Sequence, residues 1–136
     1  MGVRSEIMDF VVRPHLGHFE PNADVLIDEG GRRVLVYMEL AGIDPDSLQL
    51  SLDGHRLVIS GRREDRRCLP LADFSQKEIG FGSFTKEVYL PAPVRYDELV
   101  AEFADGILAI ALPMAEHHYV PTSRTELHII VTRIRP

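Results

Sequence analysis

The sequence has a single cysteine, Cys68, and no tryptophan among its 136 residues. One cysteine excludes an internal disulfide and a cysteine-based zinc site, and it favours a reducing compartment. No apolar run approaches the ~20 residues that a membrane-spanning helix needs. The first residues also lack the pattern of a secretory signal. These absences predict a soluble, cytoplasmic protein without a membrane span.

Basic residues are also scarce, with 15 Lys and Arg against 21 Asp and Glu and a net charge of −6. A domain that binds nucleic acid normally shows a basic excess or a basic stripe. The densest basic cluster, residues 62–67, contains its own counterions Glu64 and Asp65. A solvated loop is therefore favoured over a phosphate site. We expect no nucleic-acid partner.

Motifs of catalysis and cofactor binding are missing as well. There is no G-x-x-x-x-G-K-[ST] nucleotide loop and no G-x-S-x-G nucleophile elbow. His15 with His18, and His117 with His118, form two short pairs, which do not supply the three or four convergent ligands that zinc needs. Cys68 lies among arginines, which could lower the pKa of its thiol. A redox switch and a thiol without a functional role are both hypotheses here. We expect no enzyme activity, no catalytic residue, no metal and no cofactor.

The chain is instead rich in short stretches of alternating or β-branched apolar residues separated by turn signals. Asp53-Gly54 and Asp105-Gly106 each lie between two such stretches, which strongly indicates β-hairpins. Proline, which cannot donate to a ladder, closes other stretches at positions 91 and 113. The expected strands are residues 23–28, 34–40, 48–52, 56–61, 83–90, 99–104 and 107–112. The pattern predicts an all-β antiparallel sandwich, with residues 5–12 as the best candidate for a short helix.

Two regions depart from this pattern. Residues 62–77 form a long charged connection, and connections of ~15 residues inside compact domains are often functional or in contact with a partner. The tail is polar after residue 113 until an apolar patch at residues 127–134. Such a patch must dock on its own domain or on another chain.

Three blocks of sequence resemble, in order and spacing, the α-crystallin domain of small heat-shock proteins. They are VYMELAGIDPDSLQLSLDGHRLVISGRR, EIGFGSFTKEVYLP and AEFADGILAIALP. Ala41 and Met114 depart from the proline and lysine usual in the family. The residues matching the family signature are Ala101, Phe103, Gly106, Ile107, Leu108, Leu112 and Pro113. The resemblance implies an immunoglobulin-like β-sandwich over residues 21–113, a short N-terminal arm (residues 1–20) and a C-terminal tail (residues 114–136).

The resemblance also implies an apolar groove between the two sheets that takes up an extended segment, usually from another subunit. The strands at residues 48–52 and 99–104 carry alternating apolar side chains that suit such a groove, although ordinary core positions explain them equally well. The groove residues would be Leu48, Leu50, Leu52, Leu99, Ala101 and Phe103. The segment would present Leu127, Ile129 and Val131, with residues 129–131 and 127–129 as overlapping candidates for the family's Ile-x-[Ile/Val] motif.

For a loop this long, the resemblance implies exchange between two subunits. Phe74, Gln76 and Glu78 would lie on a short strand that pairs with residues 23–28 of the partner subunit, whereas the alternative is a flap within one chain. The implied function is an ATP-independent holding chaperone that forms dimers and higher oligomers with itself and binds partly unfolded client proteins. The second hypothesis is a co-chaperone or adaptor sandwich that binds one defined partner.

Overall fold

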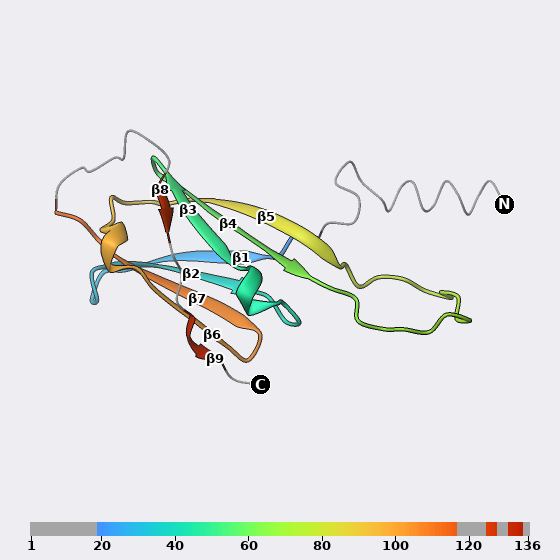
Figure 1. The fold of residues 1–136 in the computed structure, drawn as a ribbon. Helices are drawn as coiled ribbons and strands as arrows, with labels where there is room; N and C mark the ends of the chain where they lie inside the picture. The colour runs from blue at the N-terminus through green and yellow to red at the C-terminus, as the bar shows by residue number, and fades with distance from the viewer. Residues whose placement is uncertain (1–18, 117–124, 128–130, 135–136) are drawn as a thin grey trace.

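The computed structural model describes residues 19–116, 125–127 and 131–134. The candidate helix at residues 5–12 and the two histidine pairs lie outside these residues. The chain forms two β-sheets (Figure 1). The elements are β1 (Ala23–Asp28), β2 (Arg33–Glu39), the 3₁₀ turn η1 (Pro45–Ser47), β3 (Gln49–Asp53), β4 (Arg56–Arg63), β5 (Gly82–Tyr89), the 3₁₀ turn η2 (Tyr96–Glu98), β6 (Val100–Ala104), β7 (Ile107–Pro113), β8 (Thr125–Leu127) and β9 (Val131–Ile134).

One sheet has the strand order β1-β2-β7-β6-β9 and the other has the order β5-β4-β3-β8. Neighbouring strands are antiparallel except β6 and β9, which are parallel. The predicted all-β sandwich is therefore confirmed, and each expected strand lies within two residues of an observed strand at both ends. β8, β9 and the two 3₁₀ turns were not predicted, because elements this short carry too little periodicity to be recognised.

The core lies between the sheets and follows the alternation of side chains along each strand. In β2, Val34, Val36 and Met38 are at most 1% exposed, and the residues between them are half-buried or exposed. In β3, Ser51 is buried as well, although it lies on the face opposite Leu50 and Leu52. β3 is therefore covered on both faces, and within its sheet it lies between β4 and β8.

The long connection begins and ends later than the sequence suggested. β4 continues through Arg63, which pairs with Gly82 of β5, so the connection spans residues 64–81 instead of 62–77. Both residues at the end of β4 have hydrogen-bond partners outside β5. The Arg62 amide donates to Ser47 Oγ at 2.8 Å, and the Arg63 guanidinium donates to the carbonyl oxygen of Ala41 at 3.0 Å. These bonds allow strand pairing to continue past the last apolar residue.

The turn between β6 and β7 depends on Gly106. Asp105 and Gly106 have φ angles of 53° and 78°, a pair of left-handed residues typical of a type I′ hairpin. An alanine Cβ at position 106 would lie 3.2 Å from the Cβ of Ala41. We expect Gly106→Ala to lower the free energy of unfolding by about 1–2 kcal/mol, because it adds left-handed strain to this close contact. Urea titration followed by circular dichroism measures the change.

Gly30→Ala is the matched control for this substitution. A Cβ at position 30 would lie 3.6 Å from Asp28 Oδ1, an ordinary contact, and its φ is outside the left-handed region. We expect its effect to stay within about 0.5 kcal/mol. Equal urea midpoints for the two variants would contradict the role of the turn.

Candidate protein-binding surfaces

The C-terminal tail occupies the edges of both sheets on one side of the sandwich. β8 pairs with β3 and places Leu127 opposite Leu50, while β9 pairs with β6 and places Val131 opposite Ala101. The four residue steps from 127 to 131 span at most about 14 Å, so the two sheet edges lie within that distance of each other at these residues. Ile129, the middle residue of the predicted set Leu127, Ile129 and Val131, lies outside the described residues.

The six predicted groove residues all lie on or next to the two strands that carry the tail. Leu50, Leu52, Ala101 and Phe103 are buried, as is Leu48 just before β3, whereas Leu99 just before β6 is half-buried. The buried five also belong to the hydrophobic core of the sandwich. The apolar side chains predicted to form a groove therefore border both the core and the tail strands, and a role in binding other chains stays a prediction.

A second surface is the outer edge of β1, beyond which no strand lies in the part of the chain that the structure describes. Val25 and Ile27 pair with the fully buried Val36 and Val34 of β2, and residues opposite each other share a face of the sheet. Val25 and Ile27 are nevertheless 39% and 46% exposed. The second sheet therefore leaves the inner face of β1 partly uncovered, next to an edge that is open for pairing.

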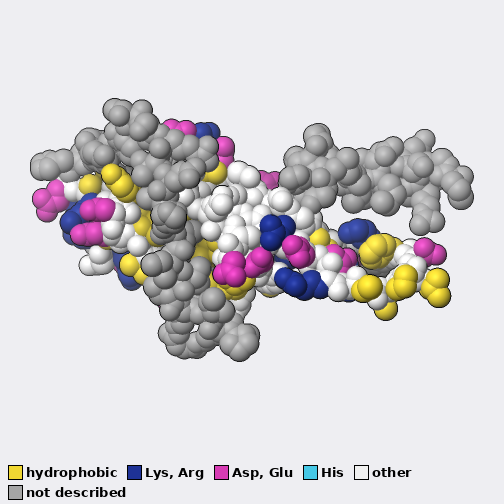
Figure 2. Space-filling view, in the orientation of Figure 1, with side chains coloured by type: hydrophobic (Ala, Val, Ile, Leu, Met, Phe, Trp, Pro, Cys, Tyr) yellow, Lys and Arg dark blue, Asp and Glu magenta, His cyan; other side chains and the backbone are white. Residues whose placement is uncertain are grey.

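The third surface is the connection at residues 64–81. We call it the arm, and it is distinct from the N-terminal arm of residues 1–20. It extends away from the sandwich beyond the ends of β4 and β5 (Figure 1). Leu71 is 99% exposed, and Leu69, Phe74 and Ile79 are more than half exposed. Figure 2 shows hydrophobic side chains gathered along the arm with charged side chains between them. The arm therefore displays apolar surface that its own chain does not cover.

The predicted exchange segment lies on the returning leg of this arm. Phe74, Gln76 and Glu78 are exposed and adopt no strand in the single chain, where the Gln76 amide donates to the Glu78 carboxylate. Cys68, near the tip, is also exposed. Pairing of this segment with a partner subunit stays a prediction.

Aromatic rings and cations alternate along the arm from its base. The Arg63 guanidinium lies 4.1 Å from the centre of the Phe19 ring and 5.6 Å from that of Phe81. Arg67 lies 5.2 Å from the Phe81 ring and 5.5 Å from the Phe74 ring. Each such contact is worth about 0.5–1 kcal/mol at an exposed site. We call this set the cation–aromatic ladder; it consists of Phe19, Arg63, Phe81, Arg67, Phe74 and Lys77, whose ammonium lies 5.4 Å from the Phe74 ring.

Both arginines of the ladder are held by hydrogen bonds. Arg63 Nε donates to the carbonyl oxygen of Gly80 at 2.9 Å, which ties the returning leg of the arm to the end of β4. Arg67 binds Asp65 through two bonds of 2.7 Å. The Arg67 side chain, together with its backbone amide, lowers the pKa of Asp65 to about 2, and the same hydrogen bond raises the pKa of Arg67. This carboxylate therefore stays charged, and the pair intact, well below neutral pH.

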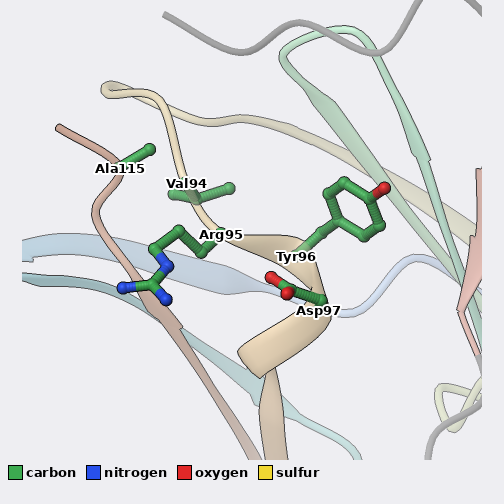
Figure 3. A pocket seen from close by; sticks show the side chains of 5 residues that line it. All are labelled: Val94, Arg95, Tyr96, Asp97 and Ala115. Carbon is green, nitrogen blue, oxygen red and sulfur yellow. The ribbon is translucent and has the colours of Figure 1, made fainter. Parts of the chain in front are cut away.

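A pocket of about 250 Å³ lies beside η2 and is lined by Val94, Arg95, Tyr96, Asp97 and Ala115 (Figure 3). Its arginine donates to Glu98 at 2.7 Å, and none of its five residues is a cysteine, serine or histidine. The described residues contain no cluster of three His, Cys, Asp or Glu side chains that could hold a metal ion. Within the same residues, no helix has the length and apolar character to cross a membrane.

Solved structures similar to this one include heat-shock proteins of three organisms. Heat shock protein 16.0 from Schizosaccharomyces pombe is 30% identical, with a TM-score of 0.63 over 77% of this chain and 96% of that chain. HspA from Xanthomonas axonopodis is 27% identical, with a TM-score of 0.64 over 74% of this chain and 98% of that chain. A small heat-shock protein from Xylella fastidiosa, reported to reveal a distinct high order structure, is 27% identical with a TM-score of 0.60 over 73% and 89% of the two chains.

Sequence comparison agrees with the fold. Small heat shock protein C4 of Rickettsia felis is 31% identical over 114 residues, which cover 82% of this chain and 69% of that protein. Heat shock protein 16 of S. pombe is 33% identical over 102 residues, 74% of this chain and 70% of that protein. The model of the Hsp20/alpha crystallin family matches residues 10–130. With the sandwich, the sequence blocks and this match in agreement, the chain belongs to the Hsp20/alpha crystallin family of small heat-shock proteins.

Proposed function

We propose that this protein is an ATP-independent holding chaperone that binds partly unfolded proteins and prevents their aggregation. One observation carries the proposal: the outer edges of β3 and β6 each take up a short extended strand, β8 and β9, from the tail of the chain. An edge that accepts a tail strand can accept another extended apolar segment, because main-chain hydrogen bonds make most of the contact. The tail then acts as an exchangeable plug.

Such a surface suits clients that have lost part of their fold. Unfolding exposes apolar side chains and strand edges, and their burial is worth about 25 cal/mol per Å² before the costs of association. No covalent bond is made or broken in this binding, so the proposal requires neither a nucleotide nor a metal. Several weak sites within one assembly would bind a client much more tightly than one site does.

Self-association in this proposal uses the arm and β1. Residues 74–78 of one chain pair with the open edge of β1 in a second copy, where they cover the exposed Val25 and Ile27. Tails docked between chains instead of within one chain link such dimers into larger assemblies.

The proposal also covers the cellular location of the protein, its lack of enzymatic activity and its partners. We place the protein in the cytoplasm, where its exposed Cys68 would stay reduced. We assign it no enzymatic activity, because its surfaces are suited to strand addition and apolar contact. Its net charge of −6 argues against nucleic acid as a partner.

Aggregation of heat-labile enzymes tests this function. We expect the protein to suppress light scattering by two unrelated model enzymes on heating, in proportion to its concentration and without ATP. An unrelated, stably folded β-sandwich domain at equal mass is the control and should give no suppression. Failure to protect either enzyme, together with a stoichiometric complex with one defined protein, would instead favour the adaptor function.

A further inference from the structure

The cation–aromatic ladder connects the arm to the core of the sandwich without a break. Phe84 of β5 is 1% exposed, and its ring centre lies 5.3 Å from that of Phe19. Phe19 stacks with Arg63, and the contacts then pass through Phe81 and Arg67 to Phe74 in the exchange segment. An otherwise exposed arm is therefore connected, as far as Phe74, to a buried ring.

The ladder also joins the two legs of the arm to each other. Arg63 ends β4, and Arg67 lies on the outgoing leg, whereas Phe81 and Phe74 lie on the returning leg. Each arginine contacts Phe81, so the guanidinium groups of β4 and of the outgoing leg both reach a ring of the returning leg. Arg67 is fixed in turn by its paired hydrogen bonds to Asp65. Contacts of this kind restrict the directions in which the arm can point.

We propose that the ladder preorganises the arm as a docking element for a second copy of this chain, with Arg63 and Arg67 as positioning residues. The inference rests on the proposed arm exchange. A segment of about eighteen residues loses much conformational entropy when it docks, and an arm already held in one direction loses less. The ladder therefore strengthens the dimer by ordering the arm before it meets the partner.

The absence of tryptophan provides the test. Phe74→Trp introduces a single fluorophore into the ladder and keeps an aromatic ring there. In this background we compare Arg67→Gln with Arg66→Gln, a neighbour with a 76% exposed side chain and only a 3.9 Å ion pair to Glu64. Phe81→Leu, which removes the ring between the arginines, is a second ladder variant. Fluorescence anisotropy in dilute, monomeric samples reports the order of the arm, and analytical ultracentrifugation gives the dimer Kd.

We expect Arg67→Gln and Phe81→Leu to lower the anisotropy of the monomer and to raise the dimer Kd about five- to thirtyfold, the effect of losing two cation–π contacts. Arg66→Gln should change neither. Equal anisotropy in all variants would overturn the ladder, and lower anisotropy with an unchanged Kd would overturn its role in dimerisation. If the parent chain itself does not dimerise, the exchange is wrong and the role of the ladder in dimerisation is wrong with it. Lower anisotropy in the two ladder variants than in the parent would then still support the ladder in the monomer.

Discussion

A chain in which Asn-Gly replaces residues 64–81 is expected to stay monomeric at concentrations where the intact chain dimerises. Arg63 and Gly82 are paired across the end of β4 and β5, so a two-residue type I′ turn can close this hairpin directly. The replacement removes the exchange segment and with it every strand that the arm could add to β1 of the partner subunit. Sedimentation velocity over a hundredfold range of concentration measures the result.

The sandwich itself should survive this deletion. Residues 64–79 contribute no buried side chain to the core, and shortening an eighteen-residue loop to two residues favours folding by about 2 kcal/mol. The deletion also removes four cation–aromatic contacts, each worth about 0.5–1 kcal/mol, and the hydrogen bond from Arg63 to Gly80. We therefore expect unchanged far-ultraviolet circular dichroism and a free energy of unfolding at most about 3 kcal/mol below that of the intact monomer, measured by urea titration.

A double variant, Leu69→Ser/Leu71→Ser, is the control for this deletion. It removes the most exposed apolar side chains of the arm tip but keeps residues 74–78 and the ladder. We expect this variant to dimerise like the intact chain. Dimerisation of the arm-less chain would contradict the exchange, whereas loss of the dimer in the control variant would assign the contact to the leucines at the tip.

The seven central strands were predictable from sequence because their determinants are local. Alternating apolar residues and the Asp-Gly turns at residues 53–54 and 105–106 specify hairpins without knowledge of the rest of the chain. The end of β4 was misplaced because Arg62 and Arg63 look like loop residues. Their partners, Ser47 and the Ala41 carbonyl, are brought close only by the fold.

The candidate surfaces were predictable to differing degrees. The apolar patch of the tail was visible in the sequence, but its division into β8 and β9 depends on two sheet edges that come together only in three dimensions. The ladder was not predictable, because it combines Phe19 with residues from both legs of the arm at irregular spacing. The interleaved arginines and acidic residues were interpreted as a solvated loop, although two of those arginines stack on aromatic rings.

The tail should control both assembly and the exposure of the groove. We expect Leu127→Asp/Val131→Asp to reduce assemblies larger than a dimer to dimers and to increase the fluorescence of an apolar dye several-fold. These two residues lie opposite Leu50 and Ala101. A leucine and a valine that become fully buried contribute about 3–6 kcal/mol together, and aspartate at both positions removes this contribution, so we expect docking of the tail to weaken about 100-fold or more. Light scattering and dye fluorescence measure the two effects.

The control Glu126→Gln/Thr132→Ser changes the same two tail strands without removing an apolar side chain, and it should leave particle size and dye fluorescence unchanged. The two readouts of the aspartate variant distinguish the ways in which the tail can act. Smaller particles with a brighter dye support a plug that also links chains. A brighter dye with unchanged particles would mean that the tail docks only within its own chain, as it does in the single chain described above. Unchanged dye fluorescence would contradict the plug itself, because the edges of β3 and β6 would then be covered without these two side chains.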